Sequence, residues 1–210
     1  LFKKSGYEIR SVRIEDAEIR ALILADGSEN WDIMKESAET EAEDESTPGM
    51  KILLRKVEML NGRINYLDLS SDIVTTLDDV SFLLTGDMTA SETNLKMMID
   101  AGKLTFEMEG MKYLNGIKSS ADIDLFANLD SMKFYLKENY LLLNDLRVNF
   151  AGVVTMPFDD IETDLTFHTV NTSIKSLMSL IPAVYMSDYS DLTTSGDIDI
   201  SGFAKGIYSD

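Results

Sequence analysis

The chain has 210 residues, no cysteine and a formal net charge of −18, from 37 acidic and 19 basic residues. The absence of cysteine excludes disulfides, thiolate zinc sites and cysteine nucleophiles. The negative charge would repel phosphate backbones and anionic bilayers, so we expect no nucleic-acid partner. A chain of this length buries about 70% of its unfolded surface on folding. Residues 1–210 can therefore form a single domain without disulfides or bound metal ions to stabilise it.

The chain begins at Leu1 and contains no apolar run close to the ~20 residues that a membrane-spanning helix needs. We therefore expect a piece of a longer protein whose targeting or anchoring segment lies outside it. Further along, residues 36–49 (ESAETEAEDESTPG) are acidic and lack apolar periodicity. This composition is typical of a flexible loop.

After the acidic segment, apolar and polar residues alternate with a period of two over most of the chain. Such alternation places the apolar side chains on one face of each strand, as in an antiparallel sheet with one dry and one solvated face. The residues that define the predicted dry face are Val80, Phe82, Leu84, Leu104, Phe106, Met108, Leu146, Val148, Phe150, Leu165 and Phe167.

Turn signals separate these alternating runs. Asn61-Gly62 lies between two apolar runs and is the strongest hairpin signal. Short connections favour a meander of hairpins, and the fold is expected to be mainly β: an extended, curved antiparallel sheet shaped as a groove, half-barrel or sandwich. Further turns are predicted at Asp26-Gly27, Ala101-Gly102, Asn115-Gly116 and Met156–Asp159.

Residues 173–187 break the strand pattern and predict one amphipathic helix that packs on the sheet. Thr172 or Ser173 can cap its start. Pro182 is expected to kink the helix or end it early.

An internal repeat is indicated by the likeness of Leu77–Gly86 to Leu143–Gly152, at a constant offset (143 − 77 = 66 and 152 − 86 = 66). A fixed offset is typical of a repeated supersecondary unit stacked along one axis. The alternative is that two amphipathic strands ending in glycine resemble each other by chance.

Residue types that could carry chemistry are sparse. His168 is the only histidine and lies on the polar phase of a strand, without the partners that a general base requires. Asp122/Asp124 and Asp197/Asp199 resemble metal-binding pairs, but a strand face supplies too few oxygen ligands for a hard cation. We therefore expect no catalytic residue, no metal site and no cofactor, and a protein that is not an enzyme.

Four segments, taken in order, resemble the AsmA family. They are Asp26–Asp32 (DGSENWD), Val57–Tyr66 with its central Asn-Gly, Leu77–Thr89 ending in Gly-Asp-Met-Thr, and the glycine pattern of Gly196–Gly206. The resemblance covers nearly the whole chain.

The resemblance implies a function as well as a fold. Members of the family are tethered to the inner membrane of Gram-negative bacteria by an N-terminal helix, with their bulk in the periplasm. They are linked to outer-membrane biogenesis and are thought to carry phospholipids along β-grooves. The implied role here is a non-enzymatic periplasmic module whose dry face binds acyl chains of a phospholipid or other apolar ligand, with envelope proteins as further partners. Compared with the family, we expect both the N-terminal anchor and the C-terminal part to lie outside this chain.

Two other hypotheses remain open at this stage. In the first, the sheet is a structural or protein-interaction module of the cell envelope that binds no lipid and works through an edge or its acidic face. In the second, the chain is an enzyme, which the lone histidine and the solvated carboxylates disfavour.

Overall fold

A computed structural model of the protein describes residues 8–31, 51–156, 160–181 and 193–208, and the structural statements below concern these residues. The predicted acidic loop at 36–49 lies outside them. In chain order the elements are β1 (Glu8–Glu15), β2 (Glu18–Ile23), β3 (Lys51–Asp68), β4 (Ile73–Thr85), β5 (Glu92–Met108), β6 (Met111–Asn128), β7 (Lys133–Leu143), β8 (Leu146–Thr155), β9 (Ile161–Thr169), β10 (Thr172–Ser173), α1 (Ile174–Met178), β11 (Asp197–Ile198) and β12 (Ser201–Tyr208).

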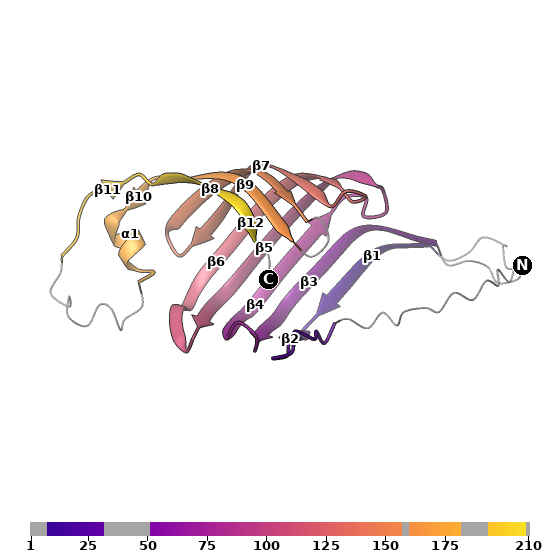
Figure 1. Cartoon of the computed structure of the whole chain (residues 1–210), viewed down its shortest axis with the longest axis horizontal. Coiled ribbons are helices and arrows are strands. Elements are labelled where there is room, and N and C mark those ends of the chain that lie inside the picture. Colours follow the sequence, from indigo (N-terminus) through magenta and orange to yellow (C-terminus); the bar gives the residue numbers. More distant parts are fainter. Residues whose placement is uncertain (1–7, 32–50, 157–159, 182–192, 209–210) are drawn as a thin grey trace, which may run out of the picture.

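The protein is one large, open, curved sheet with the strand order β1-β3-β4-β5-β6-β7-β8-β9-β12. The strands from β3 to β12 pair antiparallel in this order, whereas β1 and β2 both run parallel to β3. Figure 1 shows β3 to β6 sloping side by side and the sheet arching over at β7 to β9. The prediction of a mainly β protein with a curved antiparallel sheet is confirmed.

Three of the predicted turns are wrong, because β3 runs through Asn61-Gly62, β5 through Ala101-Gly102 and β6 through Asn115-Gly116. Asn61 has a φ of 52°, and the register between β3 and β4 shifts on either side of Gly62. The left-handed residue therefore makes a bulge inside a strand. The chain does not reverse there because β4 pairs with both halves of β3.

The chain reverses at other places, such as Glu109-Gly110 between β5 and β6. Both residues have positive φ, 52° and 73°, as a two-residue type I′ hairpin requires. The predicted turn at Asp26-Gly27 is present: the Gly27 N–H donates to the Leu24 carbonyl at 2.9 Å. Of the turn predicted at Met156–Asp159, residues 157–159 lie outside the described part.

The irregular residues lie side by side across neighbouring strands. Asp16, between β1 and β2, has a φ of 55°, and its N–H donates to the Leu60 carbonyl, next to Asn61. Asp79 in β4 also has a φ of 55°, and it lies against Gly102 of β5. Bulges bend strands and increase their twist. We therefore attribute part of the curvature of the sheet to this row.

The second half of the predicted internal repeat adopts a similar local conformation around β4 and β8. Gly86 and Gly152, at equivalent positions, have φ values of 137° and 143°, and each lies against the backbone of the next strand. Val80 and Leu146, also equivalent, are both buried. The likeness is local, because residues 77–79 lie inside β4 whereas Asn144 and Asp145 form the turn between β7 and β8. The repeated unit therefore stays a prediction.

The predicted helix is shorter than its sequence pattern suggests, since α1 ends at Met178. Ser173 caps it, as predicted, by accepting a hydrogen bond from the Ser176 N–H. Pairing of β10 with β11 holds the start of α1 beside the far end of the large sheet (Figure 1), where α1 contacts β10. The packing of the whole segment 173–187 on the sheet stays a prediction. Residues 182–187 of the prediction lie outside the described part.

Candidate functional site

The predicted dry-face residues lie on one face of the sheet, here called the inner face, because residues paired across strands share a face. The face is identified by the buried cluster of Met59, Val80 and Ala101, against which Leu77 and Phe82 pack. One continuous row across six strands consists of Met59, Phe82, Ile99, Ala121, Leu141 and Val148.

The remaining predicted residues join the same face through similar pairs. Leu104 pairs with Leu77 of the cluster and with Ile117, and Phe106 and Met108 follow it along β5. Phe150 pairs with Phe167. The rows that complete the face are Leu84 with Met97 and Ile123, Leu143 with Leu146, and Leu95 with Leu125, Leu136, Gly152, Leu165 and Ala204.

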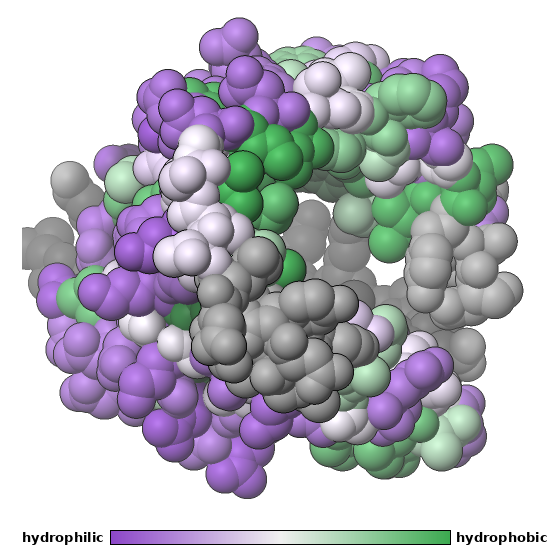
Figure 2. All heavy atoms as spheres, turned by 90° about the vertical axis from the view of Figure 1, so that its left-hand side faces the viewer, coloured by the Kyte–Doolittle hydropathy of each residue, from purple (hydrophilic) through white to green (hydrophobic). Residues whose placement is uncertain are grey.

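The inner face is not covered by a second layer in the described part of the chain. Val80 and Leu146 are buried, but the other predicted residues of the face are only half-buried. Each long strand packs on its neighbours in the sheet, and α1 contacts β10. Figure 2 shows a hollow at the centre of the molecule with hydrophobic side chains around it. The arrangement is a single-layer groove. Of the shapes predicted from sequence, the described residues therefore do not form the two-layer sandwich.

Polar side chains such as Ser119 and Thr75 also lie on the inner face, and Asn139 is deeply buried there. Asn139 is 2% exposed, and its Oδ1 accepts a hydrogen bond from the Asp124 N–H at 2.7 Å where the register between β6 and β7 shifts. Its Nδ2 has no hydrogen-bond partner among the described residues. Asn139 therefore replaces a ladder bond lost at the irregularity, at the cost of one unsatisfied donor.

The opposite, outer face carries ion pairs between neighbouring strands, with scattered apolar residues among them. Asp124 bonds Lys137 at 2.9 Å, and Asp122 lies 3.9 Å from Lys96. The Asp122/Asp124 pair thus contacts lysines on the solvated face, and exposed pairs of this kind contribute little stability. Further pairs are Arg13–Glu58, Arg63–Asp78 and Lys205–Asp164.

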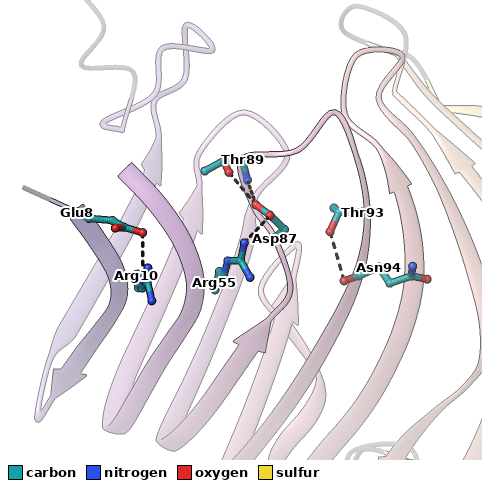
Figure 3. Close-up of polar contacts among 7 residues, drawn as sticks. All are labelled: Glu8, Arg10, Arg55, Asp87, Thr89, Thr93 and Asn94. Carbon is teal, nitrogen blue, oxygen red and sulfur yellow. Dashed lines mark hydrogen bonds and ion pairs between the residues drawn. The ribbon is translucent and has the colours of Figure 1, made fainter. Parts of the chain in front are cut away.

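The Gly-Asp-Met-Thr segment after β4 forms a turn at the rim of the sheet (Figure 3). The Asp87 carboxylate accepts hydrogen bonds from the Thr89 N–H and hydroxyl at 3.2 and 2.7 Å, and Arg55 lies 3.3 Å away. The Thr89 hydroxyl is the main cause of a lowered pKa of Asp87, helped by the Thr89 N–H and Arg55. The segment therefore has a structural role, that of an Asx turn.

Asp68 makes a similar turn after β3. Its Oδ1 accepts hydrogen bonds from the Ser70 hydroxyl at 2.6 Å and from the Ser70 and Ser71 N–H groups at 2.8 and 3.1 Å. The Ser70 hydroxyl is the main cause of the lowered pKa of Asp68. A lowered pKa in the folded state stabilises the protein above the unfolded pKa of about 3.9, and this contribution is lost as the pH falls through the folded value.

We expect Asp68→Asn to melt at a lower temperature than the wild type at pH 7. The difference should narrow as the pH falls below the unfolded pKa of about 3.9 and on through the lowered folded-state pKa of Asp68, where the wild-type carboxylate becomes protonated. Thermal melts from pH 7 to pH 2.5 measure this dependence. Asp130→Asn is the matched control, since this exposed turn aspartate has no hydrogen bond among the described residues. Equal pH dependence of the two variants would contradict the role given to Asp68.

The other sequence candidates do not converge on a site. His168 is exposed and lies on the outer face, paired with Asn149 and Ser201. Asp197 lies in β11, at the far end of the sheet. Within the described residues no group of three histidine, cysteine, aspartate or glutamate side chains could hold a metal ion. A polar depression of about 360 Å³ on the outer face contains Arg63 and Asp78, whose charges are already paired.

No protein-family model matches the chain, and neither a curated protein nor a solved structure matches it. In the described part, no helix has the length and apolar character needed to cross a membrane.

Proposed function

We propose that this protein is a non-enzymatic β-groove module that binds the acyl chains of phospholipids or a similar apolar ligand along its inner face. The observation that carries the proposal is the apolar surface that continues from β3 to β9 with no second layer over it in the described part of the chain. A sheet normally buries its dry face against another layer. A bound hydrocarbon would take the place of that layer.

The energetics of the groove favour a hydrocarbon over a polar ligand. Burial of each CH₂ contributes about 0.8 kcal/mol, so an acyl chain with ten buried methylenes gains roughly 8 kcal/mol before the cost of immobilising it. Among the cross-strand rows named above, the one charged side chain is Asp68, which shares the row of Ile73 and Met108 and already accepts hydrogen bonds from Ser70 and Ser71. These rows therefore offer no cationic partner to a phosphate headgroup, which would remain at the rim or in solvent.

The same proposal extends to the setting of the protein. We propose an AsmA-like module in the periplasm, tethered to the inner membrane through a segment outside this chain, that takes part in outer-membrane biogenesis. The support consists of the four ordered sequence motifs and an open, curved sheet with one apolar face, as such a lipid-carrying groove requires.

The test is direct detection of lipid. We expect organic extraction of the purified protein, followed by mass spectrometry, to release phospholipid. After delipidation, the protein should bind phosphatidylcholine carrying a pyrene-labelled acyl chain in a saturable manner, whereas the soluble headgroup glycerophosphocholine should not compete. A folded protein that releases no lipid and shows no saturable binding would refute the proposal.

A further inference from the structure

We propose that the open edge of β12 is a docking site for an extended polypeptide segment, which adds to the sheet as a further strand. The segment that fits has an acidic residue with an apolar residue two positions before it and another two positions after it. This inference rests on the edge and the outer face, so it stands or falls independently of lipid binding.

The backbone of β12 is prepared for a further strand. β12 pairs with β9 over its whole length without a register shift, and no described strand lies on its other side. The Thr169 N–H donates to the Ile200 carbonyl at 2.8 Å, so Ile200 and every second residue after it face β9. The N–H and C=O groups of Phe203, Lys205 and Ile207 therefore point to the open edge.

The large apolar side chains on this edge have no described strand beside them on the open side. Phe203 and Ile207 are 75% and 67% exposed, whereas the next most exposed large hydrophobic residue in the described part, Leu69, is 48% exposed. Both lie on the outer face of β12, opposite Thr166 and Glu162 of β9. An added strand with apolar residues beside Phe203 and Ile207 would cover both, because cross-strand side-chain pairs stabilise sheets.

The charge on the edge specifies the central position of the added strand. Lys205 lies between Phe203 and Ile207, and its Nζ bonds the Asp164 carboxylate at 2.6 Å. An ammonium group has three donors, so Lys205 can also pair with an acidic residue on the other side. A segment with the pattern apolar–polar–acidic–polar–apolar therefore matches this edge in register.

The opposite edge shows what a protected edge looks like in the same sheet. Natural sheets guard edges with charges, bulges and short strands. The register of β1 shifts between Ile9 and Ser11, Asp16 interrupts the edge with a φ of 55°, and Arg10 and Arg20 add charges to it. β12 has no register shift, no proline and a single charged residue. Strand addition is therefore expected at β12.

The experiment uses a fluorescein-labelled synthetic peptide with the core Val-Thr-Glu-Thr-Val and measures its fluorescence anisotropy with the full chain. Lys205→Pro removes the outward N–H without touching the bonds to β9, and proline is tolerated at an edge position of this kind. We expect Lys205→Pro to weaken peptide binding at least about tenfold relative to Lys205→Ala, which keeps the N–H.

A second measurement does not depend on the folding of a variant. A peptide methylated on alternate backbone nitrogens should bind the wild-type protein at least about tenfold more weakly than the parent peptide, because it cannot complete the ladder. Equal binding of the two peptides, or no binding of the parent peptide to the wild type, would overturn the proposal. Self-association that is lost in Lys205→Pro would also overturn it, by assigning the edge to a second copy of the chain.

Discussion

Replacement of Gly152 by alanine is expected to lower the free energy of unfolding by about 4 kcal/mol or to prevent folding. With a φ of 143°, Gly152 occupies a region of backbone conformation that is essentially restricted to glycine. A Cβ at this position would overlap the Asp164 carbonyl oxygen and would lie 2.9 Å from the Leu165 Cα. Both are backbone atoms of β9, which cannot move aside without opening the β8–β9 ladder.

Chemical denaturation followed by circular dichroism measures the loss, and the chain supplies a matched control. Gly206 lies in β12, and no described atom lies within 4 Å of the place that an alanine Cβ would take, so Gly206→Ala should change stability by no more than about 0.5 kcal/mol. Gly86→Ala should behave like Gly152→Ala, because its Cβ would lie 2.5 Å from the Asn94 carbonyl oxygen. A Gly152→Ala protein as stable as Gly206→Ala would show that the close approach of β8 and β9 is wrong.

The second large effect concerns ligand binding, where Leu141→Glu should weaken acyl-chain binding about 30-fold. Leu141 lies on the inner face between Ala121 and Val148. A carboxylate there would replace contact with two or three methylenes at about 0.8 kcal/mol each, and about 1.4 kcal/mol corresponds to tenfold in affinity.

The neighbouring Leu142→Glu is the control, because it makes the same chemical change on the other face. Leu142 is also half-buried, and it pairs with Ser120 and Arg147 on the outer face. Both variants are titrated with the pyrene-labelled lipid, and circular dichroism checks that they are folded. We expect Leu142→Glu to bind this lipid within about twofold of the wild type. Equal affinities of the two folded variants would contradict an inner-face groove.

The one-sided character of the sheet could be predicted from sequence because period-two alternation depends only on the residues of a single strand. All the residues assigned to the dry face, from Val80 to Phe167, lie on the inner face through the observed register. Whether that face is open could not be predicted, since alternation is the same whether the dry face meets a second sheet, a helix or a ligand.

The lengths of the strands were less predictable, and Asn61-Gly62 shows why. A left-handed residue followed by glycine fits both a hairpin turn and a bulge. The decision depends on β4, which pairs with the residues before and after the bulge and keeps β3 straight enough to continue. The partner strand lies elsewhere in the sequence, so a local pattern does not contain this information.

The β12 edge was missed, although the sequence contained a signal for it. Phe203, Lys205 and Ile207 alternate with small residues at positions 202, 204 and 206. Only the observed pairing with β9 shows that the large side chains lie on the outer face, at the end of the sheet.

The most direct measurement is photocrosslinking with a phosphatidylcholine that carries a diazirine at the middle of one acyl chain, followed by peptide mass spectrometry. The account predicts crosslinks to inner-face residues of the central strands, such as Phe82, Ile99 and Leu141, and their loss on competition with unlabelled lipid. Crosslinks concentrated on outer-face neighbours such as Leu83, Met98 and Leu142, or no competed crosslink in the folded protein, would contradict it.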